Sequence, residues 1–154
     1  MTLLVTRVTT AEEKKIALAL RYKVFIDEQG FDPSVEIDAY DDKDTTLHFL
    51  GKDVEQDKYV AVARVLLDPT SRKAKIGRVA VLSECRGKNY GVALMDGLEQ
   101  DIADLVDLYA LSAQYDKKGF YEKCGYSYTT GEVYMEEGVE HCMMTKKTVK
   151  RVET

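Results

Sequence analysis

Hydrophobic positions along the chain follow two periods, and the changes between them predict where strands and helices lie. Residues 3–8 are apolar and β-branched, which predicts an opening strand. Thr10 and Glu13 then form a capping-box pattern ahead of a helical stripe. The stripe consists of Ile16, Ala17, Leu20, Val24 and Phe25. The helix is expected to stop in the Gly- and Pro-containing stretch 29–33, and the acidic stretch Glu36–Asp44 is expected to be a loop.

The period then changes to that of extended chain. Residues 47–50 and 59–67, on either side of a polar turn at 51–57, have the pattern of a hairpin with a long loop. A turn follows the second strand at Asp68–Ser71. These segments predict two antiparallel neighbours in one sheet.

A parallel pair is expected in the middle of the chain. Residues 74–82 form an almost wholly apolar strand, 92–106 carry apolar residues at helical spacing, and 108–113 read as another strand. A strand, a loop, a helix and a strand in this order predict a right-handed β-α-β crossover.

The last third of the chain predicts a short helix followed by two strands. The helix covers 117–123, and Gly125 suits the left-handed residue that ends many helices. The strands are expected at 126–135 and 141–149, joined by a turn at 136–138.

The loop at 86–91 has the composition of an anion-binding turn. A strand that enters a glycine-containing turn and then a helix gathers free backbone N–H groups and the positive end of the helix dipole. Two glycines let the backbone approach a phosphate, Asn89 tolerates a left-handed conformation, and Arg86 and Lys88 add positive charge. The loop lacks the spacing of the common nucleotide-binding loops. Alone, it predicts either an anion site or a sharp turn with solvated charges.

Composition narrows the classes of protein. The 154 residues, 45% of them hydrophobic, are enough for one core, so we expect a single domain at 1–149 and a frayed tail at 150–154. A net charge of −5 argues against binding nucleic acid. No apolar run approaches the roughly 20 residues of a membrane span, and the first residues lack a signal-peptide pattern, so the expected location is cytoplasmic.

The three cysteines predict neither a disulfide framework nor a metal site. Cys85, Cys124 and Cys142 are an odd number without a Cys-x-x-Cys pair. We therefore expect reduced thiols that serve as small hydrophobic side chains.

Two motifs and their order resemble the GNAT superfamily of N-acetyltransferases. Residues Arg78–Met95 resemble its acyl-CoA signature. That signature is a Val-x-Val strand followed by Arg or Gln, two residues, Gly, one residue, and Gly or Ala before a helix. In this chain Asn89 stands where the middle glycine usually lies. Residues Phe120–Tyr126 resemble the Phe-Tyr-Glu-Lys-x-Gly-Phe ending of the next helix. The stretches Arg21–Gln29 and Glu136–Met144 look like the ElaA-like and YjcF-like branch. The resemblance covers nearly the whole chain.

The resemblance implies a fold, a cosubstrate and a reaction. The fold is a GNAT-like α/β (α+β) one, a mixed, mostly antiparallel sheet of six to seven strands with a central parallel β-α-β crossover and about four helices on both faces. The reaction is direct transfer of an acetyl group from acetyl-CoA, within a ternary complex and without a metal, to a primary amine of a small molecule or peptide. A homodimer through the terminal strands is a further expectation. The residues implied to contact CoA are Val79, Val81, Arg86, Gly87, Lys88, Asn89, Tyr90, Gly91, Val92 and Gln114.

By the same resemblance, Tyr121 is the candidate acid that protonates the leaving thiolate, although it can also be an aromatic side chain packed on the sheet. Many relatives carry a glutamate just before the residue equivalent to Arg78, but Gly77 stands here, so no base carries over. The candidate bases are Glu28, Glu36, Asp38, His48 and His141, with Glu28 and His141 ranked first.

Each of these candidates has a simpler interpretation. The carboxylates suit solvated loop positions, and His48, on an apolar strand, suits a hydrogen-bonded core residue. Arg64 and Arg78 suit ion pairs with acidic neighbours better than binding of a substrate carboxylate. The absent glutamate also leaves open an alternative function, a catalytically silent acyl-CoA-binding or regulatory module.

Overall fold

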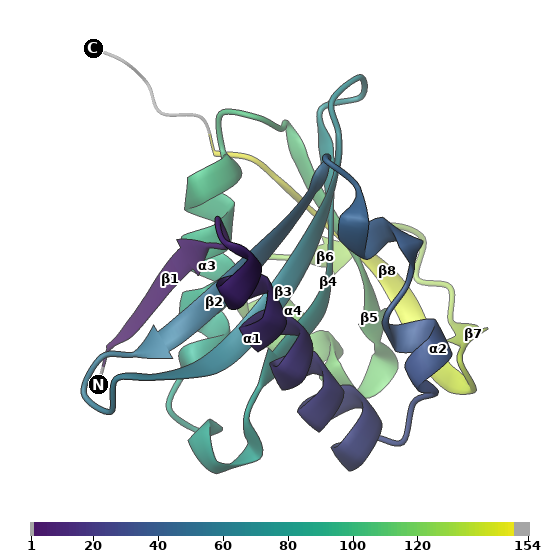
Figure 1. Ribbon diagram of the computed structural model, residues 1–154. Helices are drawn as coiled ribbons and strands as arrows, with labels where there is room; N and C mark the ends of the chain where they lie inside the picture. The colour runs from purple at the N-terminus through teal and green to yellow at the C-terminus, as the bar shows by residue number, and fades with distance from the viewer. Residues whose placement is uncertain (1, 150–154) are drawn as a thin grey trace.

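The computed structural model describes residues 2–149, which are arranged around one eight-stranded sheet (Figure 1). The strand order is β1-β2-β3-β4-β5-β8-β6, and β7 pairs with β8. The strands are β1 Leu3–Arg7, β2 Thr46–Asp53, β3 Lys58–Asp68, β4 Lys73–Val81, β5 Leu108–Gln114, β6 Ser127–Tyr128, β7 Tyr134–Glu136 and β8 Val139–Lys147. The α-helices are α1 Ala11–Arg21, α2 Pro33–Glu36, α3 Tyr90–Ile102 and α4 Lys118–Lys123. Four further turns are η1 Tyr22–Glu28, a π-helix, and the 3-10 helices η2 Ala39–Asp42, η3 Ser83–Cys85 and η4 Tyr115–Lys117. The predicted tail at 150–154 lies outside the described residues.

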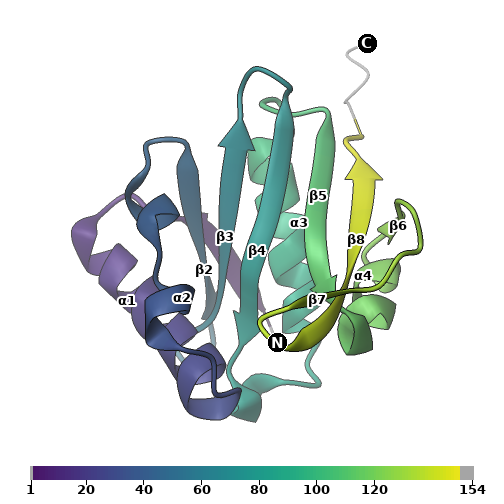
Figure 2. The ribbon, with the colours of Figure 1, turned by 90° about the vertical axis from the view of Figure 1, so that its right-hand side faces the viewer.

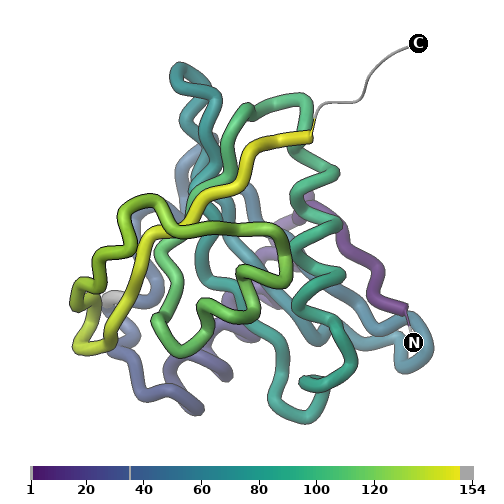
Figure 3. The backbone as a smooth tube through the Cα atoms, turned by 180° about the vertical axis from the view of Figure 1, so that it is seen from behind, coloured from purple at the N-terminus to yellow at the C-terminus, as the bar shows by residue number. Residues whose placement is uncertain are grey.

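The helices cover both faces of the sheet. Figure 2 shows α1 and α2 on one face and α3 and α4 on the other. Figure 3 views the molecule from the side of α3, which packs against β1 and the central strands. The core lies between these layers, with Phe49 and Leu50 of β2 and Leu94 and Leu98 of α3 fully buried. No helix among residues 2–149 is long and apolar enough to cross a membrane.

The sheet is antiparallel except between β4 and β5, which pair in parallel through the α3 crossover as predicted. That pairing joins residues 73–76 to residues 108–111. Beyond it, β4 contains a bulge: its pairing with β3 shifts between Val62 and Arg64, and Arg78 takes a φ of 52°. The bulge turns the end of β4 away from β5, and Figure 2 shows the two strands diverging. The centre of the sheet is therefore split.

The last part of the chain differs from the prediction. Residues 126–135 do not form one strand but two short ones, β6 and β7, each of which pairs with a different part of β8. The sheet therefore has eight strands rather than the expected six to seven. Helix α4 and the left-handed Gly125, with a φ of 96°, agree with the prediction.

The acidic stretch 36–44 was predicted as a loop, but it contains the end of α2 and the turn η2. The side chains of Asp32 and Asp38 accept hydrogen bonds from backbone N–H groups at the starts of these two turns. Glu36 and Asp41 are buried. This stretch is folded because its carboxylates bind arginines of the core, as described below.

Two predicted helices end differently from the sequence pattern. The capping box at Thr10 and Glu13 is present, but α1 ends at Arg21 and the chain continues as the wider π-turn η1. Helix α3 ends at Ile102, and Leu105, which fits the apolar stripe, is 43% exposed beyond it. Cys85 and Cys142 are buried free thiols and Cys124 is a half-buried one, in agreement with the prediction.

Candidate functional site

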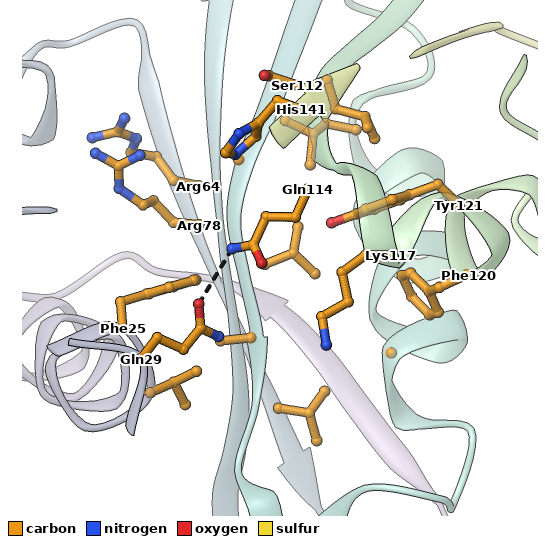
Figure 4. Close-up of a pocket in the computed structure, with 18 of the residues that line it drawn as sticks. Phe25, Gln29, Arg64, Arg78, Ser112, Gln114, Lys117, Phe120, Tyr121 and His141 are labelled. Carbon is orange, nitrogen blue, oxygen red and sulfur yellow. Dashed lines mark hydrogen bonds between the residues drawn. The ribbon is translucent and has the colours of Figure 1, made fainter. Parts of the chain in front are cut away.

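A cleft of about 720 Å³ occupies the split between β4 and β5 (Figure 4). One wall comes from η1, α2 and η2, and the other from α4 and the turn between β7 and β8. Phe25 reaches it from η1, Gln29 from the position just after η1, and Gln114 from β5. The Gln114 Nε2 donates a hydrogen bond of 3.2 Å to the Gln29 Oε1 across the opening. The cleft therefore connects both faces of the sheet.

Nearly all residues that the sequence singled out line this cleft. They are Glu36, Asp38, Arg64, Arg78, Val79, Val81, Arg86, Gly87, Asn89, Tyr90, Gly91, Val92, Gln114, Tyr121 and His141. Glu28, His48 and Lys88 do not line it. The structure thus brings together the two motifs at 86–91 and 120–126, which lie about 30 residues apart in the sequence.

The free edge of β4 offers backbone hydrogen-bonding groups to the cleft. Ala80 pairs with Val62 of β3, and alternate residues of an antiparallel strand turn their N–H and C=O groups to opposite sides. Val79 and Val81 therefore direct these groups away from β3 and toward the split. The Val81 carbonyl accepts a hydrogen bond of 3.0 Å from the Arg86 Nε. An extended polar chain could add to this edge like a strand.

The edge leads to the amino-terminal end of α3. Asn89 adopts the left-handed conformation predicted for it, with φ 62°, and its side chain does not cap the helix. The first helical bond of this turn runs from the Ala93 N–H to the Asn89 carbonyl, so the N–H groups of residues 90–92 have no acceptor within α3. Gly87, with φ 84°, lets the preceding turn fold beside them. This arrangement favours an anion.

Arg86 is held by Glu28, one of the two first-ranked candidate bases. The guanidinium binds both carboxylate oxygens, with the Nη1 at 2.7 Å from the Oε2 and the Nη2 at 3.0 Å from the Oε1. Such a bidentate pair fixes both side chains. Glu28 therefore joins η1 to the loop after β4, and its carboxylate lies outside the residues that line the cleft.

Gly91 is required by the packing of α3 against α4. A Cβ atom on Gly91 would lie 2.8 Å from the Phe120 Cε1 and 2.9 Å from its Cζ. Helices α3 and α4 thus touch through this glycine and the Phe120 ring. Phe120 in turn packs edge-on against Tyr121, with ring centroids 4.9 Å apart.

We expect Gly91→Ala to lower the free energy of unfolding by about 1–3 kcal/mol, because overpacking forces the two helices apart. Gly119→Ala is the matched control: its Cβ would meet no atom within 4 Å, so it is expected to be neutral or slightly stabilising. Urea denaturation of both variants checks this, and equal stabilities would contradict the contact.

Tyr121 projects from α4 with its hydroxyl pointing into the cleft (Figure 4). Burial raises the pKa of its phenol, so the group stays protonated at neutral pH. Its ring also packs against Tyr126, with the ring centroids 6.2 Å apart. The two interpretations of Tyr121 are therefore compatible: packing holds the ring, and the hydroxyl remains available to the cleft.

A buried ionic cluster holds the wall formed by α2 and η2. Arg21 is 0% exposed and binds Glu36 at 3.0 Å and Asp41 at 2.6 Å. Burial would raise the pKa of Asp41, but the bound Arg21 guanidinium, assisted by Arg64, holds that pKa at about 2. For Glu36, burial outweighs the nearby guanidinium groups and raises the pKa. These carboxylates are structural ion-pair partners rather than the solvated charges expected.

Arg64 and Arg78 bind acidic neighbours, in agreement with the preferred interpretation. Arg64 lies 2.7 Å from Asp38, and Arg78 lies 3.0 Å from Glu36 and 3.3 Å from Asp38. All four side chains line the cleft. The wall therefore presents paired charges to a ligand.

The two histidines have different environments. His48 is buried outside the cleft, with its Nε2 3.1 Å from the Asp41 carbonyl, and burial lowers its pKa. It is a core residue, as the simpler interpretation holds. His141 lines the cleft from β8, next to Gln114 in the register of β5 and β8.

Sequence reasoning missed two polar residues beside His141. Ser112 lies on β5 two residues before Gln114, on the same face of the strand, and its hydroxyl donates a 2.8 Å hydrogen bond to Glu136 of β7. The Glu136 Oε2 lies 3.5 Å from the His141 Nε2. The alternation along β5 was a signal that could have identified Ser112. Glu136 is the first residue of the stretch Glu136–Met144 that also contains His141, but its place beside the His141 ring depends on the fold.

Among residues 2–149, no group of three or more His, Cys, Asp or Glu side chains is arranged to hold a metal ion. The features that can hold a cosubstrate are instead the β4 edge and the amino-terminal end of α3.

Comparison with known proteins gives consistent similarities. A model of the acetyltransferase (GNAT) domain matches residues 13–148. Bacillus subtilis YjcF, named as an uncharacterized N-acetyltransferase, is 29% identical over 136 residues that cover 88% of this chain and 93% of YjcF. The crystal structure of Escherichia coli ElaA is 31% identical, with a TM-score of 0.80 over 94% of this chain and 99% of ElaA. A crystal structure of an acyl-CoA N-acyltransferase from Pseudomonas aeruginosa is 30% identical, with a TM-score of 0.79 over 94% and 99% of the two chains.

Proposed function

The chain belongs to the GNAT acetyltransferase family, and on that premise we propose that it transfers an acetyl group from acetyl-CoA to a primary amine of a small molecule or peptide. The transfer is direct, with both substrates bound at once. The observation that carries the proposal is the continuity of the cleft, from the free edge of β4 to the uncapped end of α3.

The described residues fit the two polar parts of CoA. An extended pantetheine arm carries amides that match the N–H and C=O groups of Val79 and Val81, as in strand addition. A pyrophosphate matches the three N–H groups at residues 90–92, with Gly87 and Lys88 in the turn before them. Gln114 borders the same path. Because Arg86 is bound to Glu28 and to the Val81 carbonyl, its main role in this proposal is to hold the turn rather than to supply free charge.

The acceptor amine enters from the face covered by α1 and α2. On that side the cleft is bounded by the paired charges of Asp38 and Arg64, and by Glu136 and His141 opposite. Holding the amine next to the thioester removes most of the entropic cost of bringing two molecules together. The terminal acetyl group then lies between the two walls.

Tyr121 is the proposed acid. Its hydroxyl points into the cleft and its raised pKa keeps it protonated, so it can give its proton to the sulfur as the C–S bond breaks. Of the candidate bases, His141 borders the acceptor side. Glu28 is engaged by Arg86, which favours a structural role for it.

The alternative, a silent acyl-CoA-binding or regulatory module, is favoured by Gly77, which stands where many relatives carry a glutamate. Addition of acetyl-CoA with each member of a panel of small-molecule and peptide amines separates the two functions when free thiol is followed. The proposed enzyme releases thiol in proportion to amide product with at least one amine. Saturable binding of acetyl-CoA without amine-dependent thiol release from any amine would instead support the module.

The cytoplasmic location and the assignment of residues 1–149 to one catalytic domain are part of the same proposal. The net charge of −5 supports an amine rather than a nucleic acid as the partner.

A further inference from the structure

The tautomer of His141 is fixed by the backbone. Its Nδ1 lies 2.8 Å from the Val139 carbonyl oxygen, which can only accept a hydrogen bond. The Nδ1 therefore carries a hydrogen, and in the neutral ring the lone pair is on the Nε2. His141 is only 7% exposed and its ring stacks on Tyr134 at an interplanar angle of 20°. The basic nitrogen thus has a defined direction.

Glu136 is placed to stabilise the protonated form of this ring. Its Oε2 lies 3.5 Å from the His141 Nε2. A carboxylate cannot donate a hydrogen bond to a lone pair, so the contact is favourable only when the Nε2 bears a proton. A bound proton would therefore be held between opposite charges.

Glu136 is itself oriented by a short chain of hydroxyl groups. The Ser112 Oγ donates to the Glu136 Oε2 at 2.8 Å, which leaves the Tyr134 hydroxyl to donate to the Ser112 Oγ at 2.5 Å. These residues come from β5 and from both ends of β7. The carboxylate is thereby fixed to the sheet although its side chain is 47% exposed.

Other polar groups face His141 from each neighbouring element. Gln114 of β5 lies opposite it in the sheet and is neutral. Across the cleft lie Arg64 of β3 and Arg78 of β4, both bound to carboxylates of α2 and η2 (Figure 4). Tyr121 of α4 is a protonated phenol. Glu137, in the turn, also lines the cleft. Glu136 is the charged group with a described contact to the imidazole.

We propose that Glu136 is a positioning residue for His141, and that His141 accepts the proton of the incoming ammonium group while Glu136 stabilises the resulting imidazolium. This inference rests on the proposed acyltransferase function. It places the base of the acceptor side on β8. The position on β4 where many relatives carry a glutamate is Gly77 in this chain. Within the described part of the chain, no atom lies within 4 Å of a Cβ built on Gly77, so no described side chain fills that position.

The proton balance is complete with the groups present. The His141 Nε2 takes one proton from R–NH3⁺, and the neutral amine attacks the thioester carbonyl carbon to form the C–N bond. As the C–S bond breaks, Tyr121 protonates the sulfur, and its phenolate recovers a proton from the new amide nitrogen. The imidazolium then releases its proton to solvent, so one proton appears for each amide formed.

Glu136→Gln is the test, because glutamine can still accept the hydrogen bond of Ser112 but carries no charge. The chain has two histidines, so the His141 ring signal is identified in proton NMR by its loss in His141→Gln. In the free protein, Glu136→Gln is expected to move the pH dependence of that signal to lower pH, because the variant removes the carboxylate charge 3.5 Å from the Nε2. Glu140→Gln is the matched control, since Glu140 is an exposed neighbour on β8, and a much smaller shift is expected.

The same variants are compared by pH–rate profile, with acetyl-CoA and an amine that gives turnover. The neutral imidazole is the active form, so the rate falls on the acid side; in Glu136→Gln that fall is expected at lower pH. The plateau of kcat/KM is expected to drop roughly tenfold because the base is weaker. An unmoved His141 titration, or full kcat/KM in His141→Gln, would overturn the inference. Absence of turnover with every amine would count against the proposed function instead, while the titration of the free protein still decides whether Glu136 and His141 are coupled.

Discussion

Arg21→Met is expected to lower the free energy of unfolding by about 3–5 kcal/mol, the cost of breaking a buried ion pair on one side. Arg21 is fully buried, and its guanidinium binds the carboxylates of Glu36 and Asp41 and the Glu36 carbonyl. Methionine fills much of the volume but leaves two buried carboxylates with fewer partners. Chemical denaturation, followed by circular dichroism, measures the loss.

The matched control is Arg7→Met. Arg7 also binds a carboxylate through two nitrogens, at 2.8 and 2.7 Å from Asp101, but its side chain is 36% exposed and that of Asp101 41%. An exposed pair of this kind contributes less than about 1 kcal/mol. Equal losses in the two variants would show that burial does not determine the value of these pairs, and that the wall formed by α2 and η2 is held in another way.

Tyr121→Phe is expected to lower kcat by about 100-fold, the lower end of the contribution of a general acid. The change removes the hydroxyl that points into the cleft and keeps the ring that packs on Phe120 and Tyr126. The dissociation constant for acetyl-CoA is expected to stay nearly the same, because the proposed binding groups are backbone amides of β4 and α3. Turnover by thiol release and binding by calorimetry are the two measurements.

Tyr115→Phe provides the control for this change. Tyr115 lies in η4, just before α4, and its hydroxyl accepts a hydrogen bond from Lys118 rather than lining the cleft. It is expected to leave kcat within about twofold, since its hydroxyl does not line the cleft and makes no contact with the reacting atoms. Normal turnover in Tyr121→Phe would remove Tyr121 from the mechanism, whereas equal losses in both variants would indicate disturbance of α4 as a whole.

The parts of the fold that depend on local pattern could be predicted. The apolar strand, the glycine loop and the helical stripe that become β4, the turn and α3 are consecutive in the sequence, and their periods specify the crossover. The left-handed Asn89 follows from its own preference. These features supply the predicted CoA half of the cleft.

The ionic wall could not be predicted, because its members meet only in three dimensions. Arg21, Arg64 and Arg78 come from α1, β3 and β4, and they converge on carboxylates of α2 and η2. The sequence shows the acidic stretch, but it does not show that buried arginines from other elements bind its carboxylates and hold it in place. The same limit applied to β6 and β7, because alternating residues between 126 and 135 suit one strand, whereas pairing with β8 occurs at two separate places.

The side of the cleft that carries His141 was predicted only in part. His141 was identified from its motif, but the roles of Ser112 and Glu136 depend on the register that sets Gln114 beside His141, and on the hairpin that folds β7 over β5. The packing requirement at Gly91 was also not predictable from the sequence, because the Phe120 ring that lies beside it comes from another helix.

A ¹H–¹⁵N NMR titration of the protein with acetyl-CoA decides whether acyl-CoA lies in the split between β4 and β5 with its pyrophosphate at α3. Saturable one-site shifts of the amides of Val79, Val81 and residues 87–92 are expected, with little change in the β3–β4 turn at residues 70–72, which lies at the opposite end of β4 from Val81. No saturable shift at millimolar acetyl-CoA, or shifts confined to other parts of the chain, would contradict it.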